Sequence, residues 1–264
     1  MVEEAAARPP EERFRKLRRF NGVVGVVLLL EGVLMLLLSN DRTLPLTTNY
    51  LQSDPFAEKT FPPPAQVANL RLGPMVAAFL LLSGLALLLL TLPRIHAWYV
   101  ANLKKGVNYA RWMEYSITAS LMIVVIAMLS GMWDISSLIL VFFLNMTMIL
   151  FGWMMELHNQ TTRKTNWTAF YFGCLAGIVP WVVIALYFFS AVANPGAEVP
   201  TFVYFILPIL FVFFNIFAVN MVLQYKKVGK WRDYLYGERV YIILSLLAKS
   251  ALAWQVFAGT LRGS

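Results

Sequence analysis

The chain has 264 residues, of which 59% are hydrophobic and 14% are charged, with a formal net charge of +8 and one cysteine. A soluble domain usually carries about 25% charged residues, so this composition excludes an ordinary soluble protein and favours one that crosses a membrane several times. The lone Cys174 excludes an intrachain disulfide and a CxxC pair, and the basic excess is typical of cytoplasmic loops rather than of nucleic-acid binding.

Seven apolar runs are long enough to cross a bilayer, which takes roughly 20 helical residues. They cover residues 20–39, 74–92, 108–129, 135–157, 167–193, 200–225 and 234–261. Pro180 lies inside the fifth run and predicts a kink there. We therefore predict an all-α membrane fold, in which residues 1–19 form an N-terminal segment and residues 20–261 form one bundle of seven transmembrane helices.

The lysines and arginines lie unevenly on the two sides of these spans. Seventeen of the 22 fall in the N-terminal segment and in or beside the connections after the second, fourth and sixth spans. Four lie on the opposite side, and Lys249 lies within a span. Because basic residues mark cytoplasmic connections, we predict a multi-pass protein of the cell membrane with its N-terminus in the cytoplasm and its C-terminus outside.

The longest connection, residues 40–72, then lies on the extracellular side. Thr47, Thr48 and Tyr50 favour a short hairpin strand within it. Such a loop forms either a structured cap, a dimer contact or a flexible linker, and its composition leaves these interpretations open.

Three ionisable residues lie deep inside the predicted spans: Lys249, Glu114 and Glu31. A charge in the hydrocarbon core costs about 2.5–3.5 kcal/mol on insertion scales, so such residues indicate function. Lys249 lies roughly three turns from each end of its span, too deep for its amine to reach the interface. A buried lysine either pairs with a carboxylate as a structural bridge or forms a Schiff base with an aldehyde.

Hydroxyl groups accompany two of these charges at helical spacing. Thr118 follows Glu114 by four residues and Ser245 precedes Lys249 by four, so each hydroxyl shares a helix face with its charge. A protonated imine needs a carboxylate counterion, whose hydrogen bonds such hydroxyls tune. Glu156 lies near the end of its span, and we expect its side chain to reach the membrane interface.

Methionine and aromatic residues in the spans suit a long, flat, apolar ligand, although the same residues also serve ordinary helix packing. The candidates to line such a pocket are Met122, Met148, Trp181, Phe214 and Trp254. His96 and His158 lie near separate helix ends, which favours structural roles over a metal site. The sequence contains no P-loop, zinc-protease or catalytic-triad motif, so we expect neither an enzyme nor a bound metal.

Several stretches carry a resemblance to a known family. They read GKWRDYLYGERVYIILSLLAKSALAWQVFAGTL at 229–261, RWMEYS at 111–116, MILFGW at 148–153, FGCLAGIVPW at 172–181 and NDRTLPLTTNYL at 40–51. In these stretches the chain resembles the heliorhodopsins, whose N-terminus is cytoplasmic, the reverse of other microbial rhodopsins. The resemblance extends over all but the N-terminus and parts of the first two spans.

The resemblance implies all-trans retinal on Lys249 as a protonated Schiff base, with Glu114 as its counterion. It implies polar positions around this centre at Ser83, Asn108, Thr118 and Ser245. It implies pocket positions at Met122, Asn145, Met148, Ile149, Gly152, Phe214 and Trp254. It also implies a homodimer surrounded by membrane lipid, with a light-dependent signalling or regulatory role.

The chain departs from the family at two positions near the Schiff base. Family members carry a histidine in each of the first two helices, where Leu28 and Leu87 stand here. Neither His96 nor His158 lies where it could replace them. Glu31 stands about one turn beyond Leu28 and is the candidate for accepting a proton in their place.

Three functions compete on the sequence alone. The first is a light sensor or regulator, whose basic loop at 226–239 contacts a cytoplasmic partner or anionic lipid. The second is a light-driven proton or ion transporter. Proton-pumping rhodopsins usually carry a second acid eleven positions after the counterion, and Val125 at this position argues against a pump. The third is a retinal-free transporter or scaffold with a Lys249–Glu114 bridge.

Overall fold

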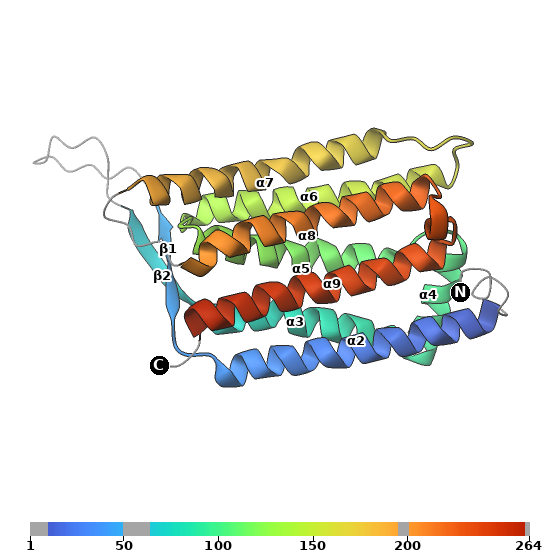
Figure 1. The fold of residues 1–264 in the computed structure, drawn as a ribbon, viewed down its shortest axis with the longest axis horizontal. Helices are drawn as coiled ribbons and strands as arrows, with labels where there is room; N and C mark the ends of the chain where they lie inside the picture. The colour runs from blue at the N-terminus through green and yellow to red at the C-terminus, as the bar shows by residue number, and fades with distance from the viewer. Residues whose placement is uncertain (1–9, 50–63, 195–200, 262–264) are drawn as a thin grey trace, which may run out of the picture.

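The computed structural model describes residues 10–49, 64–194 and 201–261. Seven helices in this part are long and apolar enough to cross a membrane. They are α2 (Pro10–Leu38), α3 (Leu72–Leu89), α5 (Tyr109–Leu129), α6 (Ile135–Asn159), α7 (Thr168–Ala193), α8 (Thr201–Tyr225) and α9 (Tyr234–Val256). They lie side by side in one bundle (Figure 1), which confirms the predicted seven-helix membrane fold.

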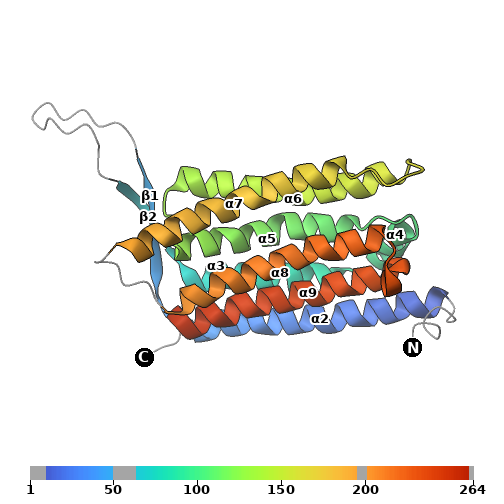
Figure 2. The same ribbon diagram turned by 45° about the horizontal axis from the view of Figure 1, so that its top comes forward.

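The helices follow one another around the bundle in chain order. The views in Figures 1 and 2 agree that α6 and α7 lie on one side and α2 and α9 on the other, with α5 and α8 between them. Aromatic rings join α7 to α8 where Trp181 packs edge-on against Phe211 and Phe214, each with 5.3 Å between ring centroids. The two ends of the described chain lie at opposite ends of the bundle, because an odd number of spans separates them.

Several boundaries differ from the predicted ones. α2 begins at Pro10 and so includes about half of the predicted N-terminal segment, because polar residues continue the helix beyond its apolar run. A further helix, α4 (Pro93–Lys104), occupies the predicted loop after the second span. Pro93 stands in its first turn, where the missing N–H of proline costs no hydrogen bond. The last span ends in a π-helical turn, η2 (Phe257–Leu261).

A two-stranded antiparallel hairpin connects α2 to α3. β1 (Thr43–Thr48) pairs with β2 (Ala65–Arg71), with an irregularity between Leu46 and Thr47. The predicted strand at Thr47 and Thr48 is therefore confirmed, whereas Tyr50 lies outside the described residues. The backbone N–H of Thr47 also donates to the carbonyl of Trp133 at 2.8 Å. The hairpin is thereby fastened to the turn between α5 and α6.

Close helix packing and an apolar outer surface both suit a bilayer. α2 approaches α3 closely, because a Cβ added at Gly84 would lie 2.8 Å from the carbonyl oxygen of Gly25. Small residues at such contacts are typical of membrane helices. Large apolar side chains cover the outside of the bundle, and Leu140 on α6 is 70% exposed.

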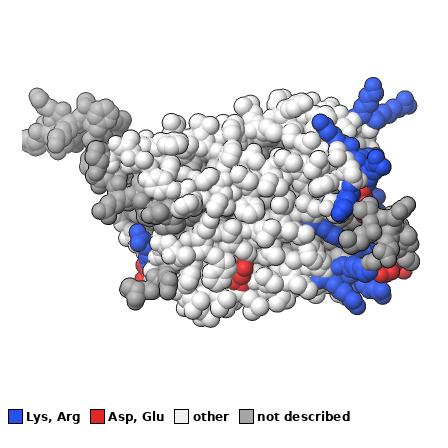
Figure 3. Space-filling view, viewed as in Figure 1, with Lys and Arg blue, Asp and Glu red and all other residues white. Residues whose placement is uncertain are grey.

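Charge is concentrated at one end of the molecule. Figure 3 shows lysines and arginines gathered at the end with α4, while the middle of the visible face is almost free of charge. This end, called the basic end below, comprises α4, the start of α2 and the connections at 160–167 and 226–233. It is opposite the hairpin (Figure 1).

Candidate functional site

Lys249 lies in the second half of α9 and points into the bundle, with 3% of its surface exposed. Its amine Nζ lies 3.0 Å from Oε1 of Glu114 on α5 and donates to Oγ of Ser245 at 2.6 Å. Ser245 stands one helical turn earlier on the same face, as its spacing predicts. The amine also lies 5.0 Å from the centre of the Tyr115 ring, so a positive charge there meets both a carboxylate and an aromatic face.

Glu114 accepts hydrogen bonds from three helices. Besides Lys249, the hydroxyls of Thr118 on α5, at 2.8 Å, and Ser83 on α3 donate to its Oε1. The Ser83 hydroxyl also lies 2.8 Å from the carbonyl oxygen of Phe79. One hydroxyl proton cannot fully serve both acceptors, so Ser83 can release or strengthen its bond to Glu114 without moving its helix. Three of the four polar residues predicted to surround this centre, Ser83, Thr118 and Ser245, are thus brought together with Lys249 and Glu114.

An apolar cavity of about 410 Å³ begins at Lys249 and extends between α5, α6, α7, α8 and α9. This volume falls in the range of about 300–1,000 Å³ typical of small-molecule sites. Six predicted pocket residues line it: Met122, Met148, Ile149, Gly152, Trp181 and Phe214.

Two glycines keep this cavity open. A Cβ at Gly152 would lie 2.5 Å from the Trp112 ring, and one at Gly177 would collide with the sulfur of Met148. A buried lysine at one end of a long cavity lined by aromatic and methionine side chains fits a conjugated apolar aldehyde such as retinal. The residues present therefore suit that group.

Two predicted pocket residues lie elsewhere. Trp254 is 37% exposed, and its indole N–H donates to Glu31 at 3.2 Å. It follows Lys249 by five residues, which turns it about 140° around the helix, away from the cavity. Asn145 is buried, but its side chain donates to Ser120 at 3.2 Å and does not line the cavity.

Asn108 also differs from its predicted place near the amine. It is the N-cap of α5, with its side-chain oxygen accepting from the backbone N–H of Arg111 at 3.0 Å. Its amide group donates to Glu238 at 2.6 Å. An N-cap residue turns its side chain toward the helix end, which takes Asn108 away from Lys249 and into a second polar cluster.

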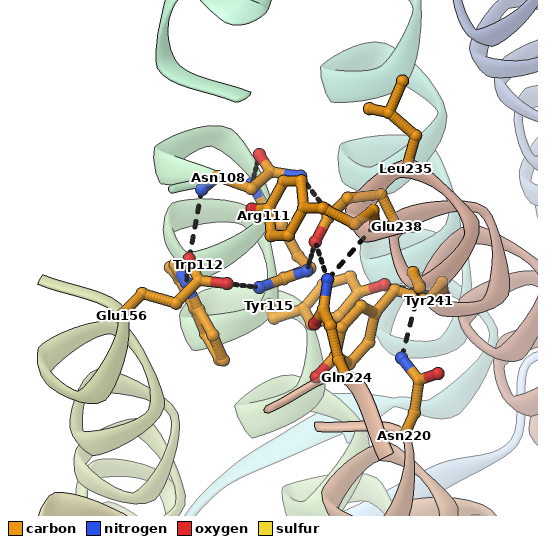
Figure 4. A network of polar contacts seen from close by, with 12 residues as sticks. Asn108, Arg111, Trp112, Tyr115, Glu156, Asn220, Gln224, Leu235, Glu238 and Tyr241 are labelled. Carbon is orange, nitrogen blue, oxygen red and sulfur yellow. Dashed lines mark hydrogen bonds and ion pairs between the residues drawn. The ribbon is translucent and has the colours of Figure 1, made fainter. Parts of the chain in front are cut away.

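This second cluster is centred on Arg111, Glu156 and Glu238 (Figure 4). The guanidinium of Arg111 forms ion pairs with both carboxylates, and all three side chains are almost completely buried. Glu156 also accepts from the indole N–H of Trp112 at 2.5 Å and the backbone N–H of Asn108 at 3.1 Å. The expectation that Glu156 reaches the membrane interface was wrong, because Arg111 binds it inside the bundle.

The sequence carried a weak signal for this cluster. Arg111 lies near the start of α5 and Glu238 near the start of α9. At such positions a side chain can turn either to water or to the interior. Only the packing of α5 against α6 and α9 brings opposite charges together there. A small cavity of about 40 Å³ lies between this cluster and Glu114 and is lined by residues of both, so it has room for a water molecule.

Glu31 on α2 contacts a different face of α9 from the one that carries the amine. Its carboxylate accepts from the hydroxyl of Ser250 at 2.7 Å and from the indole of Trp254 at 3.2 Å. Leu28, at one of the two departures from the family, is completely buried. Glu31 is therefore held at the α2–α9 contact by Ser250, the residue that follows Lys249, but it takes no part in the hydrogen bonds of Glu114.

Comparison with known proteins shows the family of the chain. The family model for heliorhodopsins matches residues 17–261, and no curated protein matches the chain. The matched range includes six of the seven spans entirely and most of the first, and Lys249 of α9 and Glu114 of α5 both lie within it. The chain therefore belongs to the heliorhodopsin family, which comprises retinal photoreceptors of the microbial rhodopsin type.

Proposed function

We propose that this protein is a light sensor with a signalling or regulatory role, in which all-trans retinal is joined to Lys249 as a protonated Schiff base and Glu114 is the counterion. The observation that carries the proposal is the position of the Lys249 amine. It lies 3.0 Å from a carboxylate and at one end of an apolar cavity of about 410 Å³. When bound, retinal supplies light absorption and isomerisation.

The residues of the chain then hold and move one proton. Burial keeps water from the Lys249 nitrogen, so its charge depends on Glu114. Because three donors share Oε1 of Glu114, loss of the lysine proton leaves two donors there. Oε1 is the nearest carboxylate oxygen on which that proton can be held, and Ser83 and Thr118 stabilise its charge before the transfer.

We propose two further features with this function. Glu31 replaces the missing histidines as a proton-accepting group, supported by its hydrogen bond from Ser250 on α9, the helix that carries Lys249. The basic end faces the cytoplasm, supported by the gathering of lysines and arginines there and by the preference of such residues for cytoplasmic connections. Accessibility of a cysteine introduced at Lys164 to a membrane-impermeant reagent, in intact cells and in lysed cells, tests this orientation.

The homodimer, the lipid contacts and a cytoplasmic partner are proposed from the family. Cross-linking in native membranes, followed by a mass measurement, tests the dimer. A monomer under every condition would remove it.

The experiment for the main proposal is an absorption spectrum of the purified chain with all-trans retinal. We expect a visible band in the wild-type protein that is absent from Lys249→Ala, because no other amine lines the cavity in the part of the chain that the structure describes. Lys226→Ala, in an exposed connection, is the matched control and should keep the band. A missing band in the wild-type protein would make Lys249 and Glu114 a structural bridge instead.

A further inference from the structure

A second cavity, of about 340 Å³, opens at the basic end. It lies between the connection at 160–167 and the connection at 226–233, which follow α6 and α8. Four basic residues line it: Lys105, Arg163, Lys227 and Arg232. The retinal site does not use this cavity, since none of these four residues borders the apolar cavity.

The charge around this cavity is strongly positive. Within the described ranges, none of its four basic residues forms an ion pair, although ion pairs occur elsewhere in the bundle. Among the described residues that line the cavity, the one carboxylate is Glu156, and Arg111 and Trp112 already occupy its oxygens. Four cations around one neutralised carboxylate attract an anion.

Two lining residues add unpaired hydrogen-bonding atoms. Gln224 is 7% exposed, and its amide group donates to the carbonyl oxygen of Tyr234 at 3.2 Å and to Glu238 at 3.3 Å. Both partners are acceptors, which fixes the amide orientation, and its Oε1 has no partner in the described part of the chain. The hydroxyl of Tyr234 is likewise buried without a partner there. Unpaired buried atoms of this kind are costly unless a ligand or water satisfies them.

Lys227 has an unusual backbone conformation at the edge of the cavity. Its φ is 52°, and it follows the end of α8, where the N–H of Val228 donates to the carbonyl of Leu223. Glycine normally occupies this left-handed position after a helix, since a side chain there is strained. The chain thus places a lysine at the cavity where glycine would fit the backbone better.

We propose that this cavity binds a phosphate group that carries a free hydroxyl, as in inorganic phosphate or the singly charged form of a phosphomonoester. The lysines and arginines pair with its charged oxygens, and the Tyr234 hydroxyl donates to another. Its P–OH donates to Oε1 of Gln224. The diester phosphate of most membrane lipids lacks that donor, so the unpaired Gln224 oxygen favours a monoester or free phosphate. The site does not depend on retinal.

The test is calorimetric titration of inorganic phosphate into the full chain in nanodiscs of neutral phosphatidylcholine at constant ionic strength. We expect saturable binding. Lys227→Gly removes one charge and relieves its backbone strain, so the variant should fold at least as well as the wild type. Its dissociation constant should rise about two- to fivefold, as for one exposed charge pair. Lys227→Gly combined with Arg232→Gln should raise it about tenfold.

Two variants separate the site from general attraction. Lys226→Gln removes a neighbouring charge outside the cavity and should leave binding within about twofold of the wild type. Tyr234→Phe keeps the ring and should weaken binding about threefold or more. Equal weakening by Lys226→Gln and Lys227→Gly would overturn the proposal, because it would show an unspecific effect of net charge.

A second arm identifies the source of the phosphate. The titration is repeated in nanodiscs that contain phosphatidic acid, whose headgroup is a phosphomonoester. Weaker apparent binding of inorganic phosphate there, with a smaller loss in Lys227→Gly, would support the site with lipid as the source. Unchanged binding would support it with a soluble source. The proposal would be overturned if inorganic phosphate showed no saturable binding in neutral nanodiscs and if Lys227→Gly did not change phosphate binding in the nanodiscs that contain phosphatidic acid.

Discussion

Arg111 holds two carboxylates from different helices at once. Glu156 belongs to α6 and Glu238 to α9, and the guanidinium also lies 4.4 Å from the centre of the Trp112 ring and 3.9 Å from that of Tyr241. Its planar fork permits these contacts together. One side chain on α5 thereby joins three helices at the basic end of the bundle.

Arg111→Gln should destabilise the protein strongly, because it leaves two buried carboxylates without their cation. Breaking a buried pair costs about 3–5 kcal/mol, and Arg111→Lys should recover little of this, since an ammonium cannot bridge both carboxylates in the same way. Arg71→Gln, which breaks an exposed pair with Asp41, should cost at most about 1 kcal/mol. Denaturant unfolding of the purified variants measures these losses; equal losses for Arg111→Gln and Arg71→Gln would contradict the prediction.

Glu31→Gln should slow the movement of the proton away from the Lys249 nitrogen after a light flash. A carboxylate positioned to accept a proton speeds the transfer by at least about a hundredfold. We therefore expect Glu31→Gln to slow it about tenfold or more. The dark spectrum should stay unchanged, since Glu31 does not contact Glu114. Time-resolved absorption measures the rate, with Glu11→Gln on the same helix as the control. Unchanged kinetics in Glu31→Gln would remove this residue from the proton path.

Spacing along single helices predicted the centre of the site well. Thr118 and Ser245 stand one turn from Glu114 and Lys249, and a helix fixes such relations without knowledge of the fold. Contacts between helices were harder to predict. The pairing of Arg111 with Glu156 and Glu238 requires that these side chains, which lie near helix ends, turn into the bundle and not to water. The sequence of a single helix does not show which of the two happens.

At the scale of elements, glycines set the distances between helices. Gly152 on α6 admits the Trp112 ring of α5 to the edge of the apolar cavity. Gly22 on α2 meets only a methyl group of Thr91, at 3.5 Å from a Cβ built there. The two positions therefore differ in what an added methyl group would displace.

Gly152→Ala should destabilise the protein by about 1–3 kcal/mol, the usual cost of overpacking, and should weaken retinal uptake by pushing Trp112 toward the cavity. Gly22→Ala is its matched control and should be neutral or stabilising, because alanine is the better helix former by about 1 kcal/mol. Thermal unfolding and retinal titration of both variants check this. Equal retinal uptake by the two variants would mean that Trp112 has room to move.

Apolar length predicted the seven spans but not the polar elements beside them. α4 was expected as a loop because it lies outside the bilayer runs, where the length criterion says nothing. For the same reason, the predicted start of the first span, at residue 20, lies ten residues after the observed start of α2 at Pro10. The hairpin was anticipated at Thr47 and Thr48, since threonine favours strands, but its partner strand at 65–71 carried no comparable signal.

At the scale of the whole molecule, the structure offers no buried acid where proton pumps usually carry one. Val125 is 1% exposed and apolar. We therefore expect no steady pH change when reconstituted vesicles are illuminated, whereas a pump would produce one that a protonophore abolishes. Such a protonophore-sensitive change would establish the alternative function, a light-driven transporter.

The fastening of the hairpin to the turn before α6 gives the bundle a fulcrum. A helix held at one end moves most at the other, and α6 has 25 residues, or roughly 37 Å at the usual rise. A tilt of about 5° about that point would carry its far end roughly 3 Å, a lever arm that follows from helix length alone. That far end leads into the connection at 160–167. A slight tilt of α6 about its fastened end would therefore displace this connection at the basic end.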